Sequence, residues 1–419
     1  SVAGRPWVRS SLNCILQRSA GMVGVSRAGW RIVALLALSS FALVACGGEK
    51  KPSTKGPTGG ETVTIGVVGA LSGANANIGR NIRDGVRVAV DEENEKTVGP
   101  RIALKEFDTA GDPAQAARVK DEVIADQSVV GIVGPSFSGE TKELIPSLQG
   151  AGLVMITPSA TNKDLATVVP DAAVFHRLVA DDSVQAIGIT EYLLKERPRS
   201  VAFVHDNSED GKGLTEEVEK LANSRGITKA LSATVDPKSE DFSATVNAIK
   251  TANPTTVFYG GYYAEAGRLK KQLIDAGVNA SFISGDKSLD AGFVRAAGDA
   301  FAEGARLTCT CNLAQELAKD KKLKTFHGLF KMKTGGNDPG VYSPEGYDAA
   351  KLLIEGIKAG SKDRPALLRH VEALKKFSGT SNPIEFEPNG NLKSKPKFFV
   401  FQVKMGRIEP LQEIKVKVA

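Results

Sequence analysis

Histidine, cysteine and aromatic residues are scarce in this chain of 419 residues, and each shortage narrows the functions open to it. There are four histidines and four cysteines, and aromatic residues make up 6% of the chain. The histidines are scattered through the sequence as His176, His205, His327 and His370. None of them stands beside a nucleophilic side chain in the sequence. The composition therefore gives no support to a histidine-assisted catalytic site.

The cysteines fall into two groups. Cys14 and Cys46 lie near the N-terminus, and Cys309 and Cys311 lie together in LTCTC. Positions i and i+2 of a strand face the same way, so the last two could pair in an oxidising exterior, or they could both stay reduced. A C-x-C motif without a nearby histidine or third cysteine is weak evidence for a metal site. We expect no metal and no other cofactor.

The signature motifs of common α/β enzymes are also missing. GVVGALSG opens a strand and a turn but lacks the G-x-G-x-x-G spacing of dinucleotide-binding sites. GPSFSG does not match the G-x-S-x-G nucleophile elbow. An α/β enzyme stays as an alternative, but the sequence favours a protein that is not an enzyme.

The positive charge of the chain comes from its N-terminus. The formal net charge is +6, from 54 basic and 48 acidic residues. Residues 1–45 carry no acid and five arginines: Arg5, Arg9, Arg18, Arg27 and Arg31. The remaining 49 basic residues nearly balance the 48 acids, which leaves the body at about +1. We therefore expect no nucleic-acid partner.

The N-terminal segment 1–45 has the pattern of a secretory signal. Arg27 and Arg31 precede an apolar run from Ile32 to Ala45, which is short for a membrane-spanning helix. LVAC, ending at Cys46, resembles the bacterial lipobox, in which the cysteine is lipidated and becomes the new N-terminus. Met22 offers a start, which would make 1–21 an upstream over-extension. The alternative for Cys46 is a buried cysteine of an apolar helix.

Residues 46–60 read as a flexible tether. The segment CGGEKKPSTKGPTGG is rich in glycine, proline, serine, threonine and lysine. It would hold a folded body away from a membrane to which Cys46 is attached by lipid chains. The sequence thus predicts an extracytoplasmic protein, lipid-anchored to the outer face of the cell membrane.

From Thr62 onward apolar strands alternate with amphipathic helices. After a first strand near Thr62, we expect strands at 101–108, 129–134, 153–156, 200–206, 255–261 and 281–286. We expect helices at 78–96, 112–126, 138–152, 181–197, 213–226, 264–277, 314–333, 345–360 and 364–377. Such alternation predicts an α/β fold built from right-handed βαβ units around parallel sheets. Antiparallel strands with a turn at Asn389-Gly390 are expected near the C-terminus.

Small hydroxylated residues gather where strands of the first half end. GPSFSGE follows one strand and TPSAT follows the next, whereas HDNSEDGKG, YGGYY and SGDKS follow strands of the second half. Ligands of open α/β sheets bind beyond these carboxyl ends. Ser138 lies at a helix start, where free N–H groups and the helix dipole suit an anion. A plain N-cap is the alternative for Ser138, and likewise for Thr161.

A family resemblance follows from motifs in this order: TIGVVGALSG, MITPSAT, VAFVHDNSEDGKG, VFYGGYYAEAG and FISGD. Their order and spacing are similar to those of bacterial branched-chain amino-acid binding proteins, over roughly residues 61–419. These are extracellular solute receptors of ABC importers with the type I periplasmic-binding fold. The resemblance implies two Rossmann-like lobes joined by a three-strand hinge. Lobe 1 would comprise 61–179 and 309–390, and lobe 2 would comprise 180–308 and 391–419.

The same resemblance implies a set of ligand-binding residues. Ser138 and Thr161 would hold the α-carboxylate of an amino acid, and the Ser159–Ala160 backbone with Asp286 would hold its ammonium group. Tyr262 would cover the ligand from the second lobe, and Tyr342 would line the cleft. Core packing is the alternative for Tyr262, and a surface turn for Asp286. Because a charged hydrogen bond contributes about 1.5–3 kcal/mol, Thr161→Ala should weaken binding about tenfold or more.

Two positions depart from the leucine-type pattern. Ile78 stands where an aromatic residue is frequent, and Asp210 stands where a tyrosine is frequent. If Asp210 points into the cleft, an unpaired carboxylate there would disfavour a purely aliphatic ligand and favour a polar, amide or cationic one. If it points outward, the prediction of an aliphatic ligand stands. The sequence leaves both orientations open.

The resemblance implies a mechanism of capture by hinge closure. The lobes would close on a branched-chain or polar aliphatic amino acid, and the closed form would deliver it to the permease subunits of an ABC importer. We expect a monomer. The alternatives are a ligand-binding sensory module for an amino acid or amide, or the α/β enzyme considered above.

Overall fold

The computed structural model describes residues 61–311, 313, 320–394 and 397–416. All of them belong to one compact unit of the chain, Gly56–Ala419. The predicted signal segment, lipobox and tether, with Cys14 and Cys46, lie outside the described residues. So does the stretch 314–319, where the sequence predicts the start of a helix.

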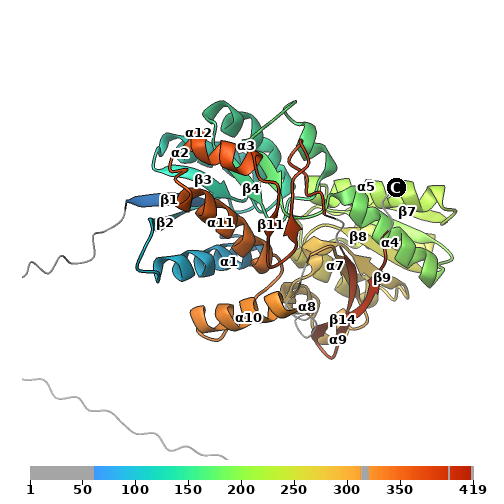
Figure 1. The fold of residues 1–419 in the computed structure, drawn as a ribbon. Helices are drawn as coiled ribbons and strands as arrows, with labels where there is room; N and C mark the ends of the chain where they lie inside the picture. Colours follow the sequence, from blue (N-terminus) through green and yellow to red (C-terminus); the bar gives the residue numbers. More distant parts are fainter. Residues whose placement is uncertain (1–60, 312, 314–319, 395–396, 417–419) are drawn as a thin grey trace, which may run out of the picture. The chain divides into compact units, whose positions relative to one another are not determined.

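The first sheet is fully parallel, with the strand order β2-β1-β3-β4-β5 (Figure 1). Its strands are β1 (Thr62–Gly69), β2 (Arg101–Asp108), β3 (Val129–Val133), β4 (Val154–Thr157) and β5 (Phe175–Arg177). The connecting helices are α1 (Ala76–Asn94), α2 (Pro113–Ala125), α3 (Ser138–Ala151) and the short η1 (Lys163–Thr167). Asp112 caps α2 by accepting a hydrogen bond from the Ala114 N–H, and Pro113 follows as its first helical residue, as the sequence predicts.

The second sheet is mixed, with the order β14-β13-β10-β9-β8-β6-β7. Its strands are β6 (Val201–His205), β7 (Lys229–Thr234), β8 (Thr256–Gly260), β9 (Ser281–Ser284), β10 (Arg306–Cys309), β13 (Phe398–Lys404) and β14 (Arg407–Ile414). The strands from β6 to β10 run parallel, whereas β13 is antiparallel to both β10 and β14. Its helices are α4 (Asp182–Glu196), α5 (Glu209–Ser224), α6 (Ser243–Ala252), α7 (Tyr263–Asp275), η2 (Asp286–Ser288), α8 (Ala291–Ala297) and α9 (Asp299–Ala302).

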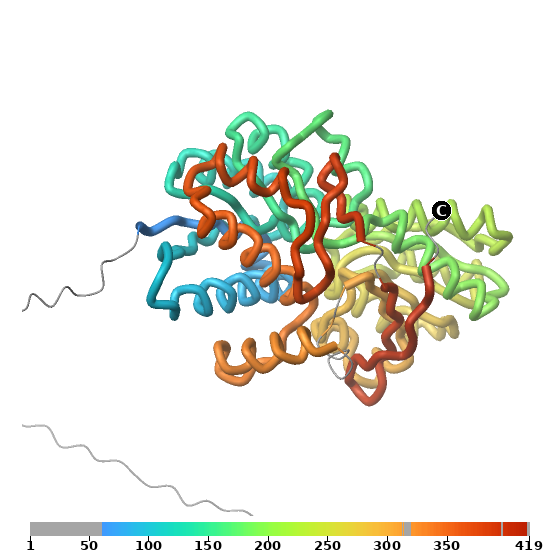
Figure 2. The backbone as a smooth tube through the Cα atoms, viewed as in Figure 1, coloured from blue at the N-terminus to red at the C-terminus, as the bar shows by residue number. Residues whose placement is uncertain are grey.

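After the second sheet the chain returns to the first. Helices α10 (Lys321–Lys333), α11 (Ser343–Lys358) and α12 (Arg364–Glu372) follow, with the small strands β11 (Phe377–Ser378) and β12 (Pro383–Ile384). Helix α11 packs along α1, and α12 packs against β3 and β4. The C-terminal hairpin β13–β14 then rejoins the second sheet (Figure 2). The fold is therefore an α/β protein of two lobes with parallel sheets, which confirms the predicted class.

Apolar side chains cover both faces of each sheet. In the first lobe, α2 and α3 contribute to one buried cluster, while α1, α11 and α12 contribute to another. In the second lobe, α4 and α5 lie in a third cluster, and α6, α7 and α8 join the cluster that contains α1. Both faces of a parallel sheet are normally buried in this way. Polar groups that take part in function are then left to the strand ends.

Local differences from the sequence prediction have local causes. Helix α5 begins at Glu209, four residues before the predicted start at 213, because the Ser208 hydroxyl caps the Gly211 N–H at 2.9 Å. Cys309 and Cys311 form a disulfide. A turn does occur at Asn389-Gly390, where Gly390 has φ of +79°, but the longer hairpin turns at Met405-Gly406. Among the described helices, none combines the length and the apolarity required to cross a bilayer.

Candidate functional site

A cluster of buried polar residues lies where the carboxyl ends of strands from both sheets meet. We call it the cleft cluster and define it as Ser138, Ser159, Asp210, Tyr262, Asp286, Lys287 and Tyr342. Ser138 follows β3, Ser159 follows β4, Asp210 follows β6, Tyr262 follows β8, and Asp286 with Lys287 follows β9. Hydrogen bonds between these residues join the two lobes. Every member except Lys287 is a residue that the sequence predicts for ligand binding.

The cluster has an anion subsite at the N-terminus of α3. The Ser138 N–H donates to Asp210 Oδ2 at 2.8 Å, and the Ser138 hydroxyl donates to Asp210 Oδ1 at 2.7 Å. The N–H groups of Thr161 and Asn162 donate in turn to Ser138 Oγ, at 3.2 and 3.1 Å. Two incoming donors leave the Ser138 proton free to point at the carboxylate. A carboxylate at a helix N-terminus is further stabilised by the helix dipole.

Ser138 is thus not an N-cap. The first helical position of α3 belongs to Ser138, and Phe137 stands at the cap position. The Glu140 side chain accepts a hydrogen bond from the Phe137 N–H at 2.8 Å, which satisfies one donor of the helix end. The amide and hydroxyl of Ser138 are therefore available to a carboxylate.

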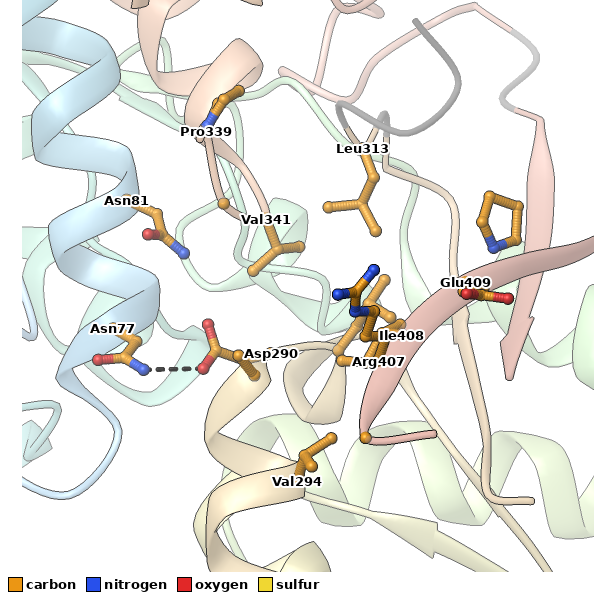
Figure 3. Close-up of a pocket in the computed structure, with 15 residues that line it drawn as sticks. Asn77, Asn81, Asp290, Val294, Leu313, Pro339, Val341, Arg407, Ile408 and Glu409 are labelled. Carbon is orange, nitrogen blue, oxygen red and sulfur yellow. Dashed lines mark hydrogen bonds between the residues drawn. The ribbon is translucent and has the colours of Figure 1, made fainter. Parts of the chain in front are cut away.

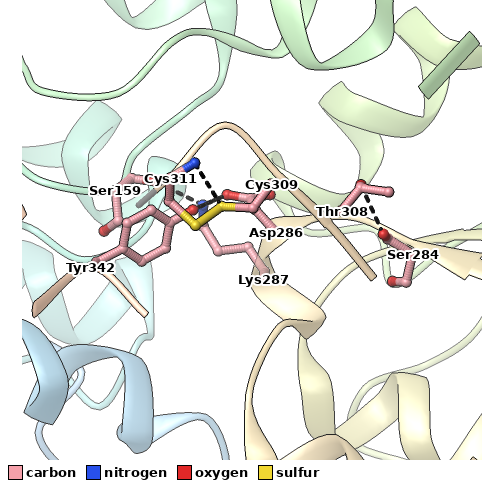
Figure 4. The surroundings of a disulfide bond; sticks show 8 residues. All are labelled: Ser159, Ser284, Asp286, Lys287, Thr308, Cys309, Cys311 and Tyr342. Carbon is pink, nitrogen blue, oxygen red and sulfur yellow. Dashed lines mark hydrogen bonds and ion pairs between the residues drawn. A yellow bond between two sulfur atoms is a disulfide. The ribbon is translucent and has the colours of Figure 1, made fainter. Parts of the chain in front are cut away.

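The cluster also has a cation subsite, which Lys287 fills (Figure 4). The Lys287 ammonium donates to the Ser159 C=O at 2.7 Å and to Asp286 Oδ2 at 2.7 Å. The Tyr342 hydroxyl donates to the same Asp286 oxygen and lies 3.5 Å from Lys287 Nζ. Lys287 Nζ is 3.6 Å from Asp210 Oδ1, so the two subsites adjoin.

The electrostatics of the cluster keep Lys287 charged. Burial, the largest influence, lowers the pKa of Lys287, but the carboxylates of Asp286 and Asp210 outweigh it and the net shift is upward. Asp182 lies at the edge of the same group. Burial raises its pKa well above the usual value, and the charges of Asp286 and Asp210 raise it further. The surroundings of the subsites are therefore rich in carboxyl groups, and a cation is needed among them.

Two tyrosines enclose the subsites. The Tyr262 hydroxyl donates to Asp210 Oδ2 at 2.9 Å, and its ring lies 4.4 Å from the ring of Phe137 on the other lobe. Tyr342 is buried, with its ring 5.2 Å from Lys287 Nζ. Its backbone has φ of +65°, a left-handed conformation that is rare for a bulky residue. Strained backbone of this kind is frequent at ligand sites.

Three predicted residues lie apart from the direct contacts of the cluster. Ile78 is fully buried in the hydrophobic core as the third residue of α1. The Ala160 N–H donates to Thr157 Oγ1 at 3.1 Å, within its own loop. Thr161 offers its N–H to Ser138 Oγ at 3.2 Å, while its side chain lies close enough to Asp182 to lower the pKa of that carboxyl. A role in ligand binding stays a prediction for each of them.

Sequence reasoning missed Lys287 and Arg177. Lys287 directly follows the predicted Asp286, and a lysine between small residues at a strand end was the available signal. Arg177 is fully buried, and its Nη1 donates to the Asn162 C=O at 2.8 Å. Its Nε donates to Asn391 Oδ1 at 2.8 Å. Arg177 thereby fixes the loop that carries Ser159 and Thr161, and its position as the last residue of the short strand β5 gave no hint of this role.

A separate cavity of about 660 Å³ lies beside α1 and the C-terminal hairpin (Figure 3). Asn77 Nδ2 donates to Asp290 Oδ1 at 2.8 Å at its edge. Val294, Leu313 and Val341 supply apolar parts of its wall. It lacks the paired carboxylate and ammonium contacts of the cleft cluster, so we place the candidate site at the cluster. Among the described residues, no group of three or more histidine, cysteine or acidic side chains is arranged to hold a metal ion.

Comparison with known proteins identifies the family to which this fold belongs. Residues 62–407 match the family described as "Periplasmic binding protein". The chain is 31% identical over 356 residues to the Leu/Ile/Val-binding protein homolog 3 of Brucella melitensis, covering 84% of this chain and 94% of that protein.

Solved structures share the fold. One is the branched-chain amino acid transporter substrate-binding protein of Streptococcus pneumoniae in complex with isoleucine, with a TM-score of 0.75 and 23% identity over 84% of this chain and 99% of that one. Another is a solute-binding protein of an ABC transporter from R. palustris in complex with benzoate, with a TM-score of 0.75 and 18% identity over 85% of this chain and 98% of that one. The chain belongs to the periplasmic binding protein family, whose members are extracytoplasmic substrate-binding receptors.

Proposed function

We propose that this protein binds an α-amino acid between its lobes and delivers it to the permease of an ABC importer. One observation carries the proposal. The cleft cluster holds a carboxylate against Ser138 and an ammonium group against Ser159 and Asp286, 3.6 Å apart. These are the two charged groups of an α-amino acid. In this structure the chain supplies them itself, through Asp210 and Lys287.

The anion subsite suits the α-carboxylate of a ligand. It offers an N–H and an O–H donor at the start of α3 without a basic side chain, so it binds a negative group by hydrogen bonds and the helix dipole. The donors belong to the first lobe, whereas the Tyr262 hydroxyl reaches the same carboxylate from the second lobe. A carboxylate at this point therefore stabilises the closed arrangement.

The cation subsite suits the α-ammonium group. Its acceptors are the Ser159 C=O from the first lobe and the Asp286 carboxylate from the second. The Tyr342 hydroxyl holds the same Asp286 oxygen that accepts from the ammonium. The subsite thus combines a formal negative charge with two neutral groups, and a cation is preferred to water or to a neutral group.

A branched-chain or polar aliphatic side chain agrees with the surroundings of Asp210. Its carboxyl points into the cleft, so the case against an aliphatic ligand depends on whether that carboxyl is unpaired. Ser138, Tyr262 and Lys287 all contact it here, and a ligand carboxylate that takes its place at Ser138 requires Asp210 to leave the subsite. A further cation from the ligand is not required. The B. melitensis relative named for leucine, isoleucine and valine supports the same ligand class.

We propose further that Cys46 is lipidated and anchors the mature protein to the outer face of the membrane, where the permease lies. The support is in the sequence alone, in the apolar run 32–45, the LVAC motif and the polar tether after it. A Cys46→Ala variant, expressed with its leader, should no longer label with a radioactive fatty acid or partition with membranes. Labelling of that variant at the wild-type level would contradict the anchor.

The ligand is testable with the purified body of the protein. Thermal-shift screening against the twenty amino acids should raise the melting temperature with at least one aliphatic member, since ligand that binds only the folded state stabilises it. Calorimetry of Ser138→Ala should then show an affinity reduced about tenfold or more. Ser243→Ala is the matched control, because Ser243 also begins a helix, α6, but is exposed. No response to any amino acid would overturn the proposal.

A further inference from the structure

Side chains of the protein itself occupy both ligand subsites. Asp210 makes the contacts expected of a ligand carboxylate, and Lys287 makes those expected of a ligand ammonium group. Both side chains are almost fully buried, with 3% of Asp210 and 2% of Lys287 exposed. A ligand with the same two charged groups needs the same donors and acceptors. It cannot bind there until Asp210 and Lys287 have moved.

We propose that Asp210 and Lys287 act as an internal competitor of the amino-acid ligand, holding the cleft closed until a ligand replaces both charges. The inference rests on the proposed function and deepens it. It assigns two specificity-determining residues and a defined ligand-free state. We call them the internal pair.

The internal pair joins the lobes by the same contacts that a ligand would make. Asp210 belongs to α5 of the second lobe and accepts both hydrogen bonds of Ser138 on the first. Lys287 belongs to η2 of the second lobe and donates to the Ser159 C=O on the first. Closure around a ligand is the usual motion of two-lobed receptors. Here side chains of the protein itself make the closing contacts, so we expect the lobes to close before a ligand binds.

The internal pair is suited to leave. Lysine carries its charge on a flexible stem of four carbons, so its ammonium can withdraw to solvent when another ammonium takes its place. Asp210 lies in the first turn of α5, next to the exposed Glu209. When both withdraw, Ser138, Ser159 and Asp286 keep equivalent partners from the ligand. The apparent affinity is the intrinsic affinity multiplied by the fraction of protein in which the internal pair has left the subsites.

The internal pair competes differently with amino acids and with simple carboxylic acids. An α-amino acid replaces both members of the pair. A carboxylic acid without an amino group can replace Asp210 alone, and Lys287 then stays in the cation subsite beside the ligand carboxylate. Removal of the Lys287 charge should therefore strengthen binding of leucine and should not strengthen binding of 4-methylpentanoate, the acid that lacks the amino group.

The first measurement requires no ligand. Small-angle X-ray scattering of the ligand-free wild type should give the radius of gyration calculated for the closed structure. Asp210→Asn and Lys287→Met should each give a larger radius, because the first weakens a closing contact by loss of its charge and the second removes one. Glu209→Gln and Lys142→Met are matched controls. These residues also pair across the cleft, at 2.7 Å, but both are largely exposed. An expanded wild type, with the same radius as the variants, would overturn the inference.

The second measurement is calorimetry of wild type, Lys287→Met, Asp210→Asn and Lys142→Met with leucine, isoleucine, valine and 4-methylpentanoate. We expect Lys287→Met to bind its best amino acid at least tenfold more tightly than wild type, with the affinity of Lys142→Met within twofold of wild type. If Lys287→Met does not fold, Asp210→Asn serves the same comparison, because it keeps an oxygen acceptor and loses only the charge. Unchanged or weaker amino-acid binding by both variants would overturn the inference.

The two measurements separate this inference from the proposed function. If no amino acid binds to wild type or any variant, the proposed ligand is wrong, but scattering that shows a closed wild type and open variants still supports the internal pair. If amino acids bind wild type and variants equally and wild type is open, the proposed function stands and the internal competitor is rejected.

Discussion

Two neighbouring acids on α5 show how strongly location decides what a charge does. Glu209 and Asp210 both reach across the cleft, the first to Lys142 and the second to Ser138, and Asp210 also pairs with Lys287 of its own lobe. Glu209 and Lys142 are about half exposed, whereas Asp210 and Lys287 are buried. Water weakens the outer pair, but the inner pair depends on its protein partners. The outer pair therefore contributes little energy, whereas the inner pair organises the site.

The largest expected effect comes from breaking the inner pair. Lys287→Met leaves Asp182, Asp210 and Asp286 near one another without their common cation. Removal of one partner of a buried ion pair typically costs about 3–5 kcal/mol, so the ligand-free variant should lose stability by that amount. Urea denaturation without ligand measures it. Lys142→Met should lose less than about 1 kcal/mol. Equal losses in the two variants would mean that burial does not distinguish these pairs.

The next effect concerns pH, through a carboxyl group close to the anion subsite. Burial raises the pKa of Glu140 to about 8, and the nearby charges of Asp210 and Asp108 add to the increase. Because the folded state holds this proton more tightly than the unfolded state, its contribution is full below pH 4.5 and is lost as pH rises toward 8. Over that window the stability should fall by about 1.4 kcal/mol per pH unit for one proton.

Glu140→Gln should remove that slope while keeping the hydrogen-bonding capacity toward Phe137 and Thr109. The measurement is urea denaturation of wild type and variant at several pH values from 5 to 8.5. Burial also raises the pKa of Asp206 to about 7 and of Asp348 to about 6, so the wild-type slope has several sources of the same sign. Only the difference between the two proteins reports Glu140, and parallel curves would contradict its raised pKa.

A smaller effect should distinguish Ser138, which contacts the carboxylate directly, from Thr161, which supports Ser138. The Thr161 N–H donates to Ser138 Oγ, whereas the Thr161 side chain lies toward Asp182, whose pKa it lowers. In contrast to the sequence expectation, Thr161→Ala should therefore weaken amino-acid binding by less than tenfold, whereas Ser138→Ala should weaken it by tenfold or more. Calorimetry of both variants with the same amino acid gives the ratio. A larger loss in Thr161→Ala would place its hydroxyl in direct contact with the ligand.

The sequence was sufficient for the fold and for most of the cluster because both follow from local patterns. Strand and helix alternation predicts parallel sheets, and the rule that ligands bind at carboxyl ends of strands indicates the loops in which the family resemblance then points to Ser138, Ser159, Asp210, Tyr262 and Asp286. The sequence did not predict which residues these side chains contact. That Asp210 contacts Ser138 depends on how two lobes face each other, across 72 positions of sequence. No periodicity carries that information.

Lys287 is a second example of a contact that the sequence does not predict. The resemblance implies that its neighbour Asp286 binds a ligand ammonium group, whereas no role is predicted for Lys287. Only the three-dimensional structure shows that its side chain turns inward to the Ser159 C=O, at 2.7 Å. A side chain that imitates a ligand is invisible to a search for residues that bind one.

The smallest expected effect comes from breaking the outer pair. Glu209→Gln removes a contact between partners that are 41% and 53% exposed, and its loss should cost about 0.2–1 kcal/mol in low salt. The difference from wild type should shrink as ionic strength rises, because salt screens exposed charges within about 10 Å at 0.1 M. Urea denaturation in 0.02 M and 0.5 M sodium chloride measures it. A salt-independent loss would show that Glu209 acts through the adjacent Asp210, and the contrast between rim and interior would then fail.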